Sequence, residues 1–116
     1  MAKPSNNEQV LQGTLDLLIL KTLSLTPMHG WGLTHRIEQL SEDALQVGQG
    51  SIYPALVRLE QRGWIDTDWR VTENNRRAKY YSLTTQGRAK LKQETRDWEV
   101  QTTAIHRILR ASLGEL

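Results

Sequence analysis

Residues 50–65 read GSIYPALVRLEQRGWI, and this stretch decides the fold. At about 100° per residue, the rotation of an α-helix, the aliphatic side chains gather on one face: Ile52, Ala55, Leu56 and Leu59. The far face is small, polar and basic, and it carries Gly50, Ser51, Pro54, Arg58 and Gln61, with Arg62 nearby. Because Gly63 is a typical helix stop, the pattern predicts an amphipathic helix over about residues 50–62. Its polar face is either a solvated surface or a surface that binds a ligand.

Two more helices are predicted before this stretch. Residues 9–25 are apolar on most sides, which is typical of a buried helix or a subunit contact, and Pro27 ends that segment. A second helix covers about residues 30–40, where Trp31, Leu33 and Ile37 recur at helical spacing. Trp31, like the later Trp64, is therefore expected in the core. Residues 42–49 form a loop, and residues 1–8 a loose polar arm.

After residue 63 the period changes to that of strands. Apolar residues and Thr67 alternate with polar ones in WIDTDWRV, residues 64–71. The segment TENNRR supplies a turn, because Asn74 and Asn75 tolerate a positive φ, and a second strand follows at about residues 77–83. Thr84 offers an N-cap to a last long helix over about residues 85–112.

The predicted order is therefore helix, helix, helix, hairpin, helix. This is a mainly α fold with a small β-hairpin, the winged helix-turn-helix arrangement, plus a long C-terminal helix. The sequence divides into a flexible N-terminal arm over residues 1–8, a winged-helix DNA-binding domain over residues 9–84 and a C-terminal dimerisation helix over residues 85–116.

The composition excludes several classes of protein. The chain has 116 residues, a net charge of +2 and no cysteine, so disulfides, thiolate nucleophiles and cysteine-rich zinc sites are absent. The mildly basic balance permits a nucleic-acid partner without requiring one. The longest apolar run, LDLLILKTLSL, contains Asp16 and Lys21 and is too short to span a bilayer. With no signal-peptide pattern at the N-terminus, we expect a cytoplasmic protein without a membrane partner.

No catalytic constellation is visible, so we expect neither an enzyme nor a cofactor. There is no nucleophile elbow and no pairing of histidine with a carboxylate in a catalytic pattern. His35 and Glu38 stand three apart on one helix and could pair on a metal, but no third or fourth ligand is near in the sequence. His29, in MHGWG, is expected to organise the turn into the second helix.

A DNA groove suits the polar face of the 50–62 helix. Small residues at Gly50 and Ser51 allow close approach of a phosphate to the free N–H groups of the helix N-terminus. Arg58, two turns on, is long enough to reach a base edge or a phosphate, while Tyr53 offers a hydroxyl and Val57 a contact for a thymine methyl.

The predicted hairpin is basic as well, and this favours DNA over a merely solvated face. Arg76, Arg77 and Lys79 cluster with Arg70 across the hairpin, so the helix and the hairpin tip would together hold phosphate at two points. The alternative is a winged helix that contacts other proteins. Such a module would carry a hydrophobic third helix and a hairpin without basic residues.

Four segments together resemble the PadR family of bacterial transcriptional regulators, which comprises phenolic-acid-responsive repressors and their relatives. They are LQGTLDLLILKTLS, HGWGLTHRI, SIYPALVRLEQRGWI and RRAKYYSLTTQGR, within about residues 9–110, and the pattern is that of the short-chain subgroup. The resemblance implies a two-fold dimer on operator DNA, joined through the first and last helices. Ser51, Tyr53, Pro54 and Arg58 match the family's recognition helix, and its wing is matched by Arg76, Arg77, Lys79 and Tyr80. Tyr81 and Leu83 would pack the wing onto the core, and Ala78 replaces a basic residue of many relatives.

The last helix carries a weak apolar seam. Leu91, Trp98 and Ile105 are spaced by seven, with Thr95, Thr102 and Leu109 between them, and a second line holds Val100, Ala104 and Ile108. With Leu15 and Leu18 of the first helix, this seam is expected to form a homodimer interface or an effector pocket. Trp98 either packs the dimer or, as the resemblance implies, lines a pocket for a small aromatic or apolar effector. The expected function is a ligand-responsive repressor.

Overall fold

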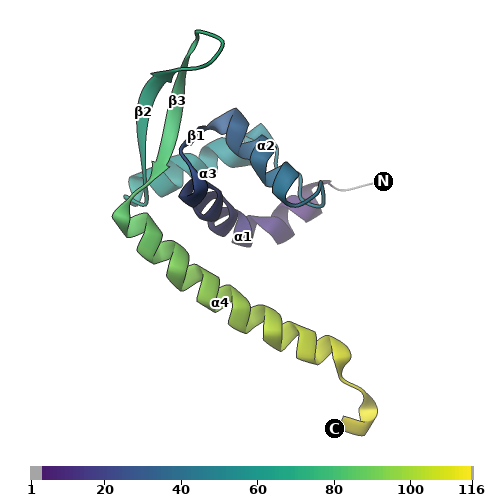
Figure 1. Ribbon diagram of the computed structural model, residues 1–116. Helices are drawn as coiled ribbons and strands as arrows, with labels where there is room; N and C mark the ends of the chain where they lie inside the picture. The colour runs from purple at the N-terminus through teal and green to yellow at the C-terminus, as the bar shows by residue number, and fades with distance from the viewer. Residues whose placement is uncertain (1–3, 116) are drawn as a thin grey trace.

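The computed structural model describes residues 4–115 and the side chains of residues 14–114. Its helices are α1 (Pro4–Leu25), α2 (Gly30–Leu40), α3 (Gln49–Gln61) and α4 (Thr85–Arg110), with a short 3-10 turn at Leu113–Glu115. Its strands are β1 (Met28–His29), β2 (Ile65–Val71) and β3 (Arg77–Leu83). The predicted order of three helices, a hairpin and a last long helix is confirmed (Figure 1).

Capping residues account for two of the helix starts. His29 precedes α2, and its Nδ1 accepts a hydrogen bond of 2.9 Å from the backbone N–H of Gly32. Thr84 does the same for α4, since its hydroxyl accepts from the N–H of Gly87 at 2.9 Å. Both roles were predicted from the sequence and are confirmed.

The first helix begins earlier than the sequence pattern indicated. We expected a loose arm over residues 1–8, but α1 already starts at Pro4, so that expectation was wrong for residues 4–8. Proline is well tolerated at the first helical position, because no N–H donor is needed there. Residues 1–3 lie outside the described part of the chain.

The hairpin belongs to a three-stranded antiparallel sheet in the order β1-β3-β2. The third strand, β1, is two residues long and pairs Met28 with Tyr81 and His29 with Tyr80. Sequence periodicity did not predict β1, because two residues cannot display a period of two. The turn between β2 and β3 has Asn75 at φ 60°, the left-handed conformation that asparagine tolerates.

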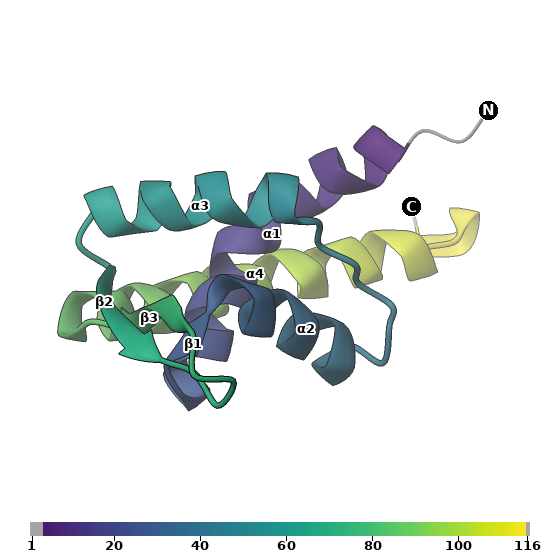
Figure 2. The ribbon, with the colours of Figure 1, turned by 90° about the horizontal axis from the view of Figure 1, so that it is seen from above.

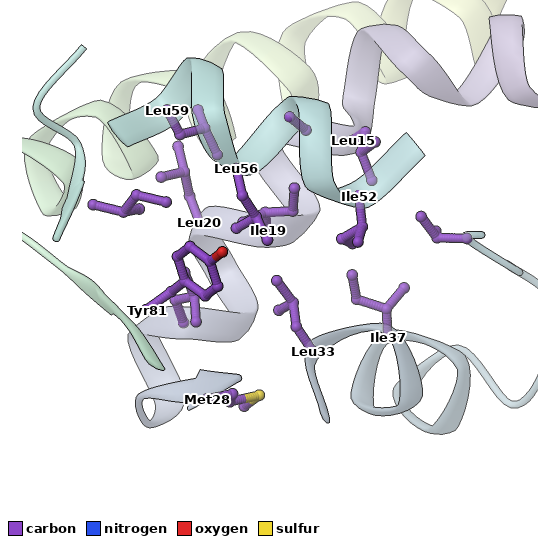
Figure 3. Packing of buried hydrophobic residues seen from close by; sticks show 14 residues of the cluster. Leu15, Ile19, Leu20, Met28, Leu33, Ile37, Ile52, Leu56, Leu59 and Tyr81 are labelled. Atoms are coloured by element: carbon purple, nitrogen blue, oxygen red, sulfur yellow. The ribbon is translucent and has the colours of Figure 1, made fainter. Parts of the chain in front are cut away.

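The core lies where α1, α2, α3 and the base of the sheet meet (Figure 3). The predicted inner face of α3 is fully buried, since Ile52, Ala55, Leu56 and Leu59 are each 0% exposed. Residues of the other elements complete the cluster: Ile19 and Leu20 from α1, Leu33 and Ile37 from α2, and Ile65 and Tyr81 from the sheet. Tyr81 and the partly buried Leu83 hold the hairpin to this core, as expected.

Trp31 and Trp64 were both expected in the core, but only Trp64 packs against it. Trp64 is half-buried against the core, with the Arg62 guanidinium and the Lys90 ammonium over its ring. Trp31 is 61% exposed, so its placement in the core was wrong. The helical spacing is real, but Leu33 and Ile37 lie on the inner face of α2, and Trp31 lies away from it.

The last helix leaves the core and projects from it (Figure 1). Gly87 is its buried residue, and it lies directly against the backbone carbonyl of Trp64, where any side chain would collide. Leu91 still packs on the core, whereas the apolar side chains beyond it are exposed. Seen from above, α2 and α3 lie on the two sides of α1, and α4 passes beneath (Figure 2).

Candidate nucleic-acid interface

The N-terminal turn of α3 is open. Gly48 is its N-cap in an extended conformation and provides no side-chain capping bond. A Cβ at Gly48 or Gly50 would meet no atom within 4 Å, so a bulky ligand group could approach the backbone here. The outer face that follows is exposed as predicted, with Tyr53, Pro54 and Val57 at the surface and Ser51 half-buried.

Tyr53 is held at the junction of α3 with α2. A Cβ on Gly30 would lie 2.6 Å from its hydroxyl oxygen, so the ring rests against the start of α2 where only glycine fits. The ring also lies near Tyr81. Burial raises the pKa of the Tyr81 hydroxyl, and Tyr53 and Glu60 raise that pKa further. Tyr53 remains 42% exposed, so its contact with α2 fixes the ring and still leaves it accessible.

Arg58 is engaged within the protomer. Its Nη2 donates a hydrogen bond of 2.6 Å to Oδ1 of Asp16 in α1, and both side chains are half-buried. The sequence predicted a guanidinium free to reach a base edge or a phosphate. The structure instead joins it to a residue 42 positions away, a partner that no local pattern could reveal.

Glu60 connects α3 to the hairpin, and sequence reasoning missed it. Its Oε2 accepts a hydrogen bond of 3.1 Å from the hydroxyl of Thr67 in β2. Its Oε1 lies 3.9 Å from the ammonium of Lys79 in β3. One carboxylate therefore links the candidate reading helix to both strands of the hairpin. A single glutamate in an amphipathic helix gives no signal of such a role.

We call the hairpin over residues 65–83 the wing. The basic residues of the wing divide between its two faces. Trp69 and Lys79 are opposite in register, so they share a face, and the Arg77 guanidinium lies 5.4 Å from the Trp69 ring centroid. Arg70 points to the other face, where it pairs with Asp68 at 3.1 Å and lies over Tyr80 at 5.1 Å. The expected clustering of Arg70 with Lys79 was therefore wrong. Arg76 and Arg77 form no ion pair in the described part of the chain, and both are exposed at the wing tip.

The residues predicted for a dimer interface or effector pocket fall into two groups, one that packs in the protomer's own core and one that is exposed on α4. Leu15 is only 4% exposed and belongs to the protomer's own core, against which Leu18 and Leu91 also pack. The placement of Leu15 at a subunit contact was therefore wrong, because the surrounding helices already cover it. Trp98, Ile105 and Leu109 are 42%, 52% and 74% exposed, so a continuous apolar surface on α4 is left uncovered.

The described residues form neither a metal site nor a membrane-spanning helix. Across the described residues, no group of three histidine or acidic side chains is placed to hold a metal ion, so His35 and Glu38 gain no further ligand. None of the helices that the structure describes is long and apolar enough to cross a membrane.

Three helices with a β-hairpin after the third, an exposed polar face on that third helix and exposed basic residues at the hairpin tip define a winged-helix DNA-binding protein. Residues 19–93, more than half of the chain, match the transcriptional regulator PadR-like family. The chain therefore belongs to the PadR family, whose members are transcriptional regulators rather than enzymes.

Solved structures agree with this assignment. A transcriptional regulator from Clostridium thermocellum is 25% identical with a TM-score of 0.80, over 88% of this chain and 99% of that one. A PadR-like transcriptional regulator from Bacillus cereus is 26% identical with a TM-score of 0.78, over 90% of this chain and 99% of that one. An uncharacterised protein of Lysinibacillus sphaericus is 24% identical over 89 residues, which span 77% of this chain and 82% of the relative.

Proposed function

We propose that this regulator is a sequence-specific repressor that binds a two-fold operator as a homodimer and is released by a small aromatic or apolar effector. The observation that carries the proposal is the exposed face of α3 beside a wing whose tip exposes Arg76 and Arg77. An exposed polar helix face alone would be ordinary, but its position next to two exposed arginines that form no ion pair among the described residues favours a polyanionic partner. The proposal places the protein in the cytoplasm, together with the DNA it regulates.

In this proposal, α3 enters the major groove and the wing contacts the backbone. Gly50 and Ser51 admit a phosphate to the open helix N-terminus, and Tyr53, Pro54 and Val57 face the base edges. The wing contributes Arg76, Arg77, Lys79 and Tyr80. Because Lys79 and Tyr80 point to opposite faces of the wing, only one of them faces a given DNA strand. Arg58 has one nitrogen, Nη2, engaged by Asp16, so its remaining N–H groups are the donors left for DNA.

The exposed apolar surface of α4 supports the dimer. A helix with Trp98, Ile105 and Leu109 this exposed lacks a hydrophobic partner among the described residues of the protomer. A second copy related by a two-fold axis would cover these residues and place two α3 helices one helical turn of DNA apart, about 34–36 Å, or a multiple of that distance.

The exposure of Trp98 supports the proposed effector site. A large ring that is 42% exposed at the N-terminal end of this surface provides a flat apolar wall for a flat apolar compound. Such a compound would release DNA by binding more tightly to a dimer whose α3 helices are wrongly spaced. Titration with a broad panel of aromatic compounds tests this part. At least one compound should change the fluorescence of the wild type but not that of Trp98→Ala, and no such difference across the panel would exclude an effector at Trp98.

Salt dependence of binding to the regulator's own upstream DNA tests the central proposal. If each protomer neutralises about three phosphates, log Kd should change with log salt by roughly 0.9 per phosphate. Arg77→Gln should lower that slope by about one for each protomer and weaken all sequences alike. Binding that does not depend on salt, or an Arg77→Gln variant with the wild-type slope, would contradict the proposed role of the wing.

A further inference from the structure

Trp31 lies in an exposed cluster of rings at the start of α2 that the proposed function does not use. Its indole is 61% exposed and stacks on His35, with ring centroids 4.8 Å apart and planes 16° from parallel. The ring of His29 is tilted by 33° to the indole, with ring centroids 6.1 Å apart. Among the described residues, neither the indole N–H of Trp31 nor the imidazole of His35 has a hydrogen-bond partner.

The cluster adjoins both parts of the proposed DNA interface. Gly30, the residue before Trp31, is the one against which the Tyr53 ring of α3 rests. His29 pairs in register with Tyr80 of the wing, and the two rings meet edge to face at 5.4 Å. Figure 1 shows α2 and the wing on the upper side of the molecule, with α4 running below them. The cluster therefore extends the surface formed by α3 and the wing.

The chemistry of the cluster fits a sugar-phosphate backbone. An indole N–H and an imidazole N–H donate to phosphate oxygens, and their ring faces pack on deoxyribose. The first turn of α2 contains no acidic residue, so the partial positive charge of the helix start is not neutralised. The backbone N–H of Gly32 donates to Nδ1 of His29, so Nε2 is the ring nitrogen that carries the N–H. Glu38 lies one turn beyond His35, and its negative charge disfavours a phosphate there. The region that favours a phosphate is therefore limited to the start of the helix.

We propose that Trp31 and His35 form a third DNA contact, which grips the backbone beside the groove that α3 enters. This inference rests on the proposed function. Because the contact is to sugar and phosphate, it adds affinity for every sequence and contributes nothing to discrimination between sequences. It holds α2 against the backbone of one strand of the duplex.

Measurement of Kd by fluorescence anisotropy on two duplexes tests this inference. One duplex comes from the regulator's own upstream region, and the other is a random sequence of the same length. Trp31→Gln and His35→Gln should each raise both Kd values by about three- to tenfold, the loss of one hydrogen bond. The ratio of the two Kd values should not change. Leu40→Ala is the matched control, since Leu40 is 56% exposed on the same helix but at its far end, and it should leave both Kd values as they are.

The outcomes separate this inference from the proposed function. Wild-type Kd values in Trp31→Gln overturn the inference, and so does a changed ratio, which would indicate base reading. A changed oligomeric state with unchanged Kd would show that the cluster contacts a second copy of the chain. If the wild type binds neither duplex, the proposed function fails together with the inference. Phosphate ethylation interference adds a direct readout, because one interfering phosphate per half-site should disappear in Trp31→Gln.

Discussion

Arg58 lies on the outer half of α3, yet its guanidinium is joined to Asp16 of α1 at 2.6 Å. An arginine held by a carboxylate at this distance fixes the helix on its support, and the pair restricts how far the guanidinium can move outward. Gly30 and Tyr53 show a similar arrangement, in which a contact with a neighbouring helix orients a residue of the reading surface. At the scale of single residues, the reading surface is therefore preformed by contacts to α1 and α2.

The pair of Asp16 and Arg58 leads to a prediction about stability. Asp16→Ala should lower the free energy of unfolding by about 0.5–1.5 kcal/mol, since one half-exposed, charge-assisted hydrogen bond is lost. Urea unfolding of Asp16→Ala, Arg58→Ala and the double variant should give a coupling energy of the same size. A coupling energy near zero, with Arg58→Ala altering only DNA specificity, would show that Arg58 reads bases and is not a support for α3.

Residue patterns predicted the inner face of α3. They could not predict the contacts of Arg58 with Asp16 and of Tyr53 with Gly30. The period of a helix determines which side chains share a face, so Ile52, Leu56 and Leu59 were found at once. The partner of Arg58 depends on the angle at which α1 crosses α3, which is a property of tertiary packing. Trp31 was misplaced for a related reason, because an apolar residue at helical spacing can still lie outside the arc that a neighbour covers.

The wing is anchored to the core only at its base, and Glu60 adds a polar contact to α3. Beyond Tyr81 it leaves the core, and Trp69 and Val71 are 59% and 64% exposed although they continue the alternation of a buried strand. Alternation predicted the strands and their bounds, but it could not show that only the base of the hairpin is covered. The carboxylate of Glu60, which contacts Thr67 and lies near Lys79, is the polar link that holds this projecting hairpin to α3.

Loss of that link should loosen the wing. Glu60→Ala should speed amide hydrogen exchange in β2 and β3, while the amides of α1 and α3 keep their protection, because the core does not depend on Glu60. Thr67→Val should have part of the effect, since it removes one contact and keeps the charge. Asp68→Asn is the control, as Asp68 pairs with Arg70 on the other face of the wing. Equal exchange in Glu60→Ala and the wild type would rule out this role.

The whole molecule places its two proposed contact regions on opposite sides. The wing, α2 and α3 lie together, and α4 runs away below them (Figure 1). The result is an elongated protomer, with extents of 63 × 39 × 23 Å. The length and start of α4 could be predicted from its cap and composition. Which of its residues the protomer leaves uncovered could not, because that depends on where the helix leaves the core, at about Leu91.

The uncovered surface of α4 predicts the oligomeric state. Sedimentation should show a dimer for the wild type, and Ile105→Glu should weaken the dimer by about two orders of magnitude or more, since burial of an unpaired carboxylate costs several kcal/mol. Arg96→Gln, on the far side of α4, should leave the dimer intact. A wild type that sediments as a monomer, or an Ile105→Glu variant that remains a dimer, would contradict an interface at this surface.

The central claim is that α3 and the wing of two protomers read a two-fold DNA sequence. Selection of bound duplexes from a random pool tests it most directly, with the regulator's own upstream region as the reference. The account predicts an inverted repeat whose half-sites are centred about 34–36 Å apart, or a multiple of that distance, and whose preference changes in Tyr53→Phe or Val57→Ala. A pool without enrichment, or an enriched sequence that both variants select unchanged, would contradict it.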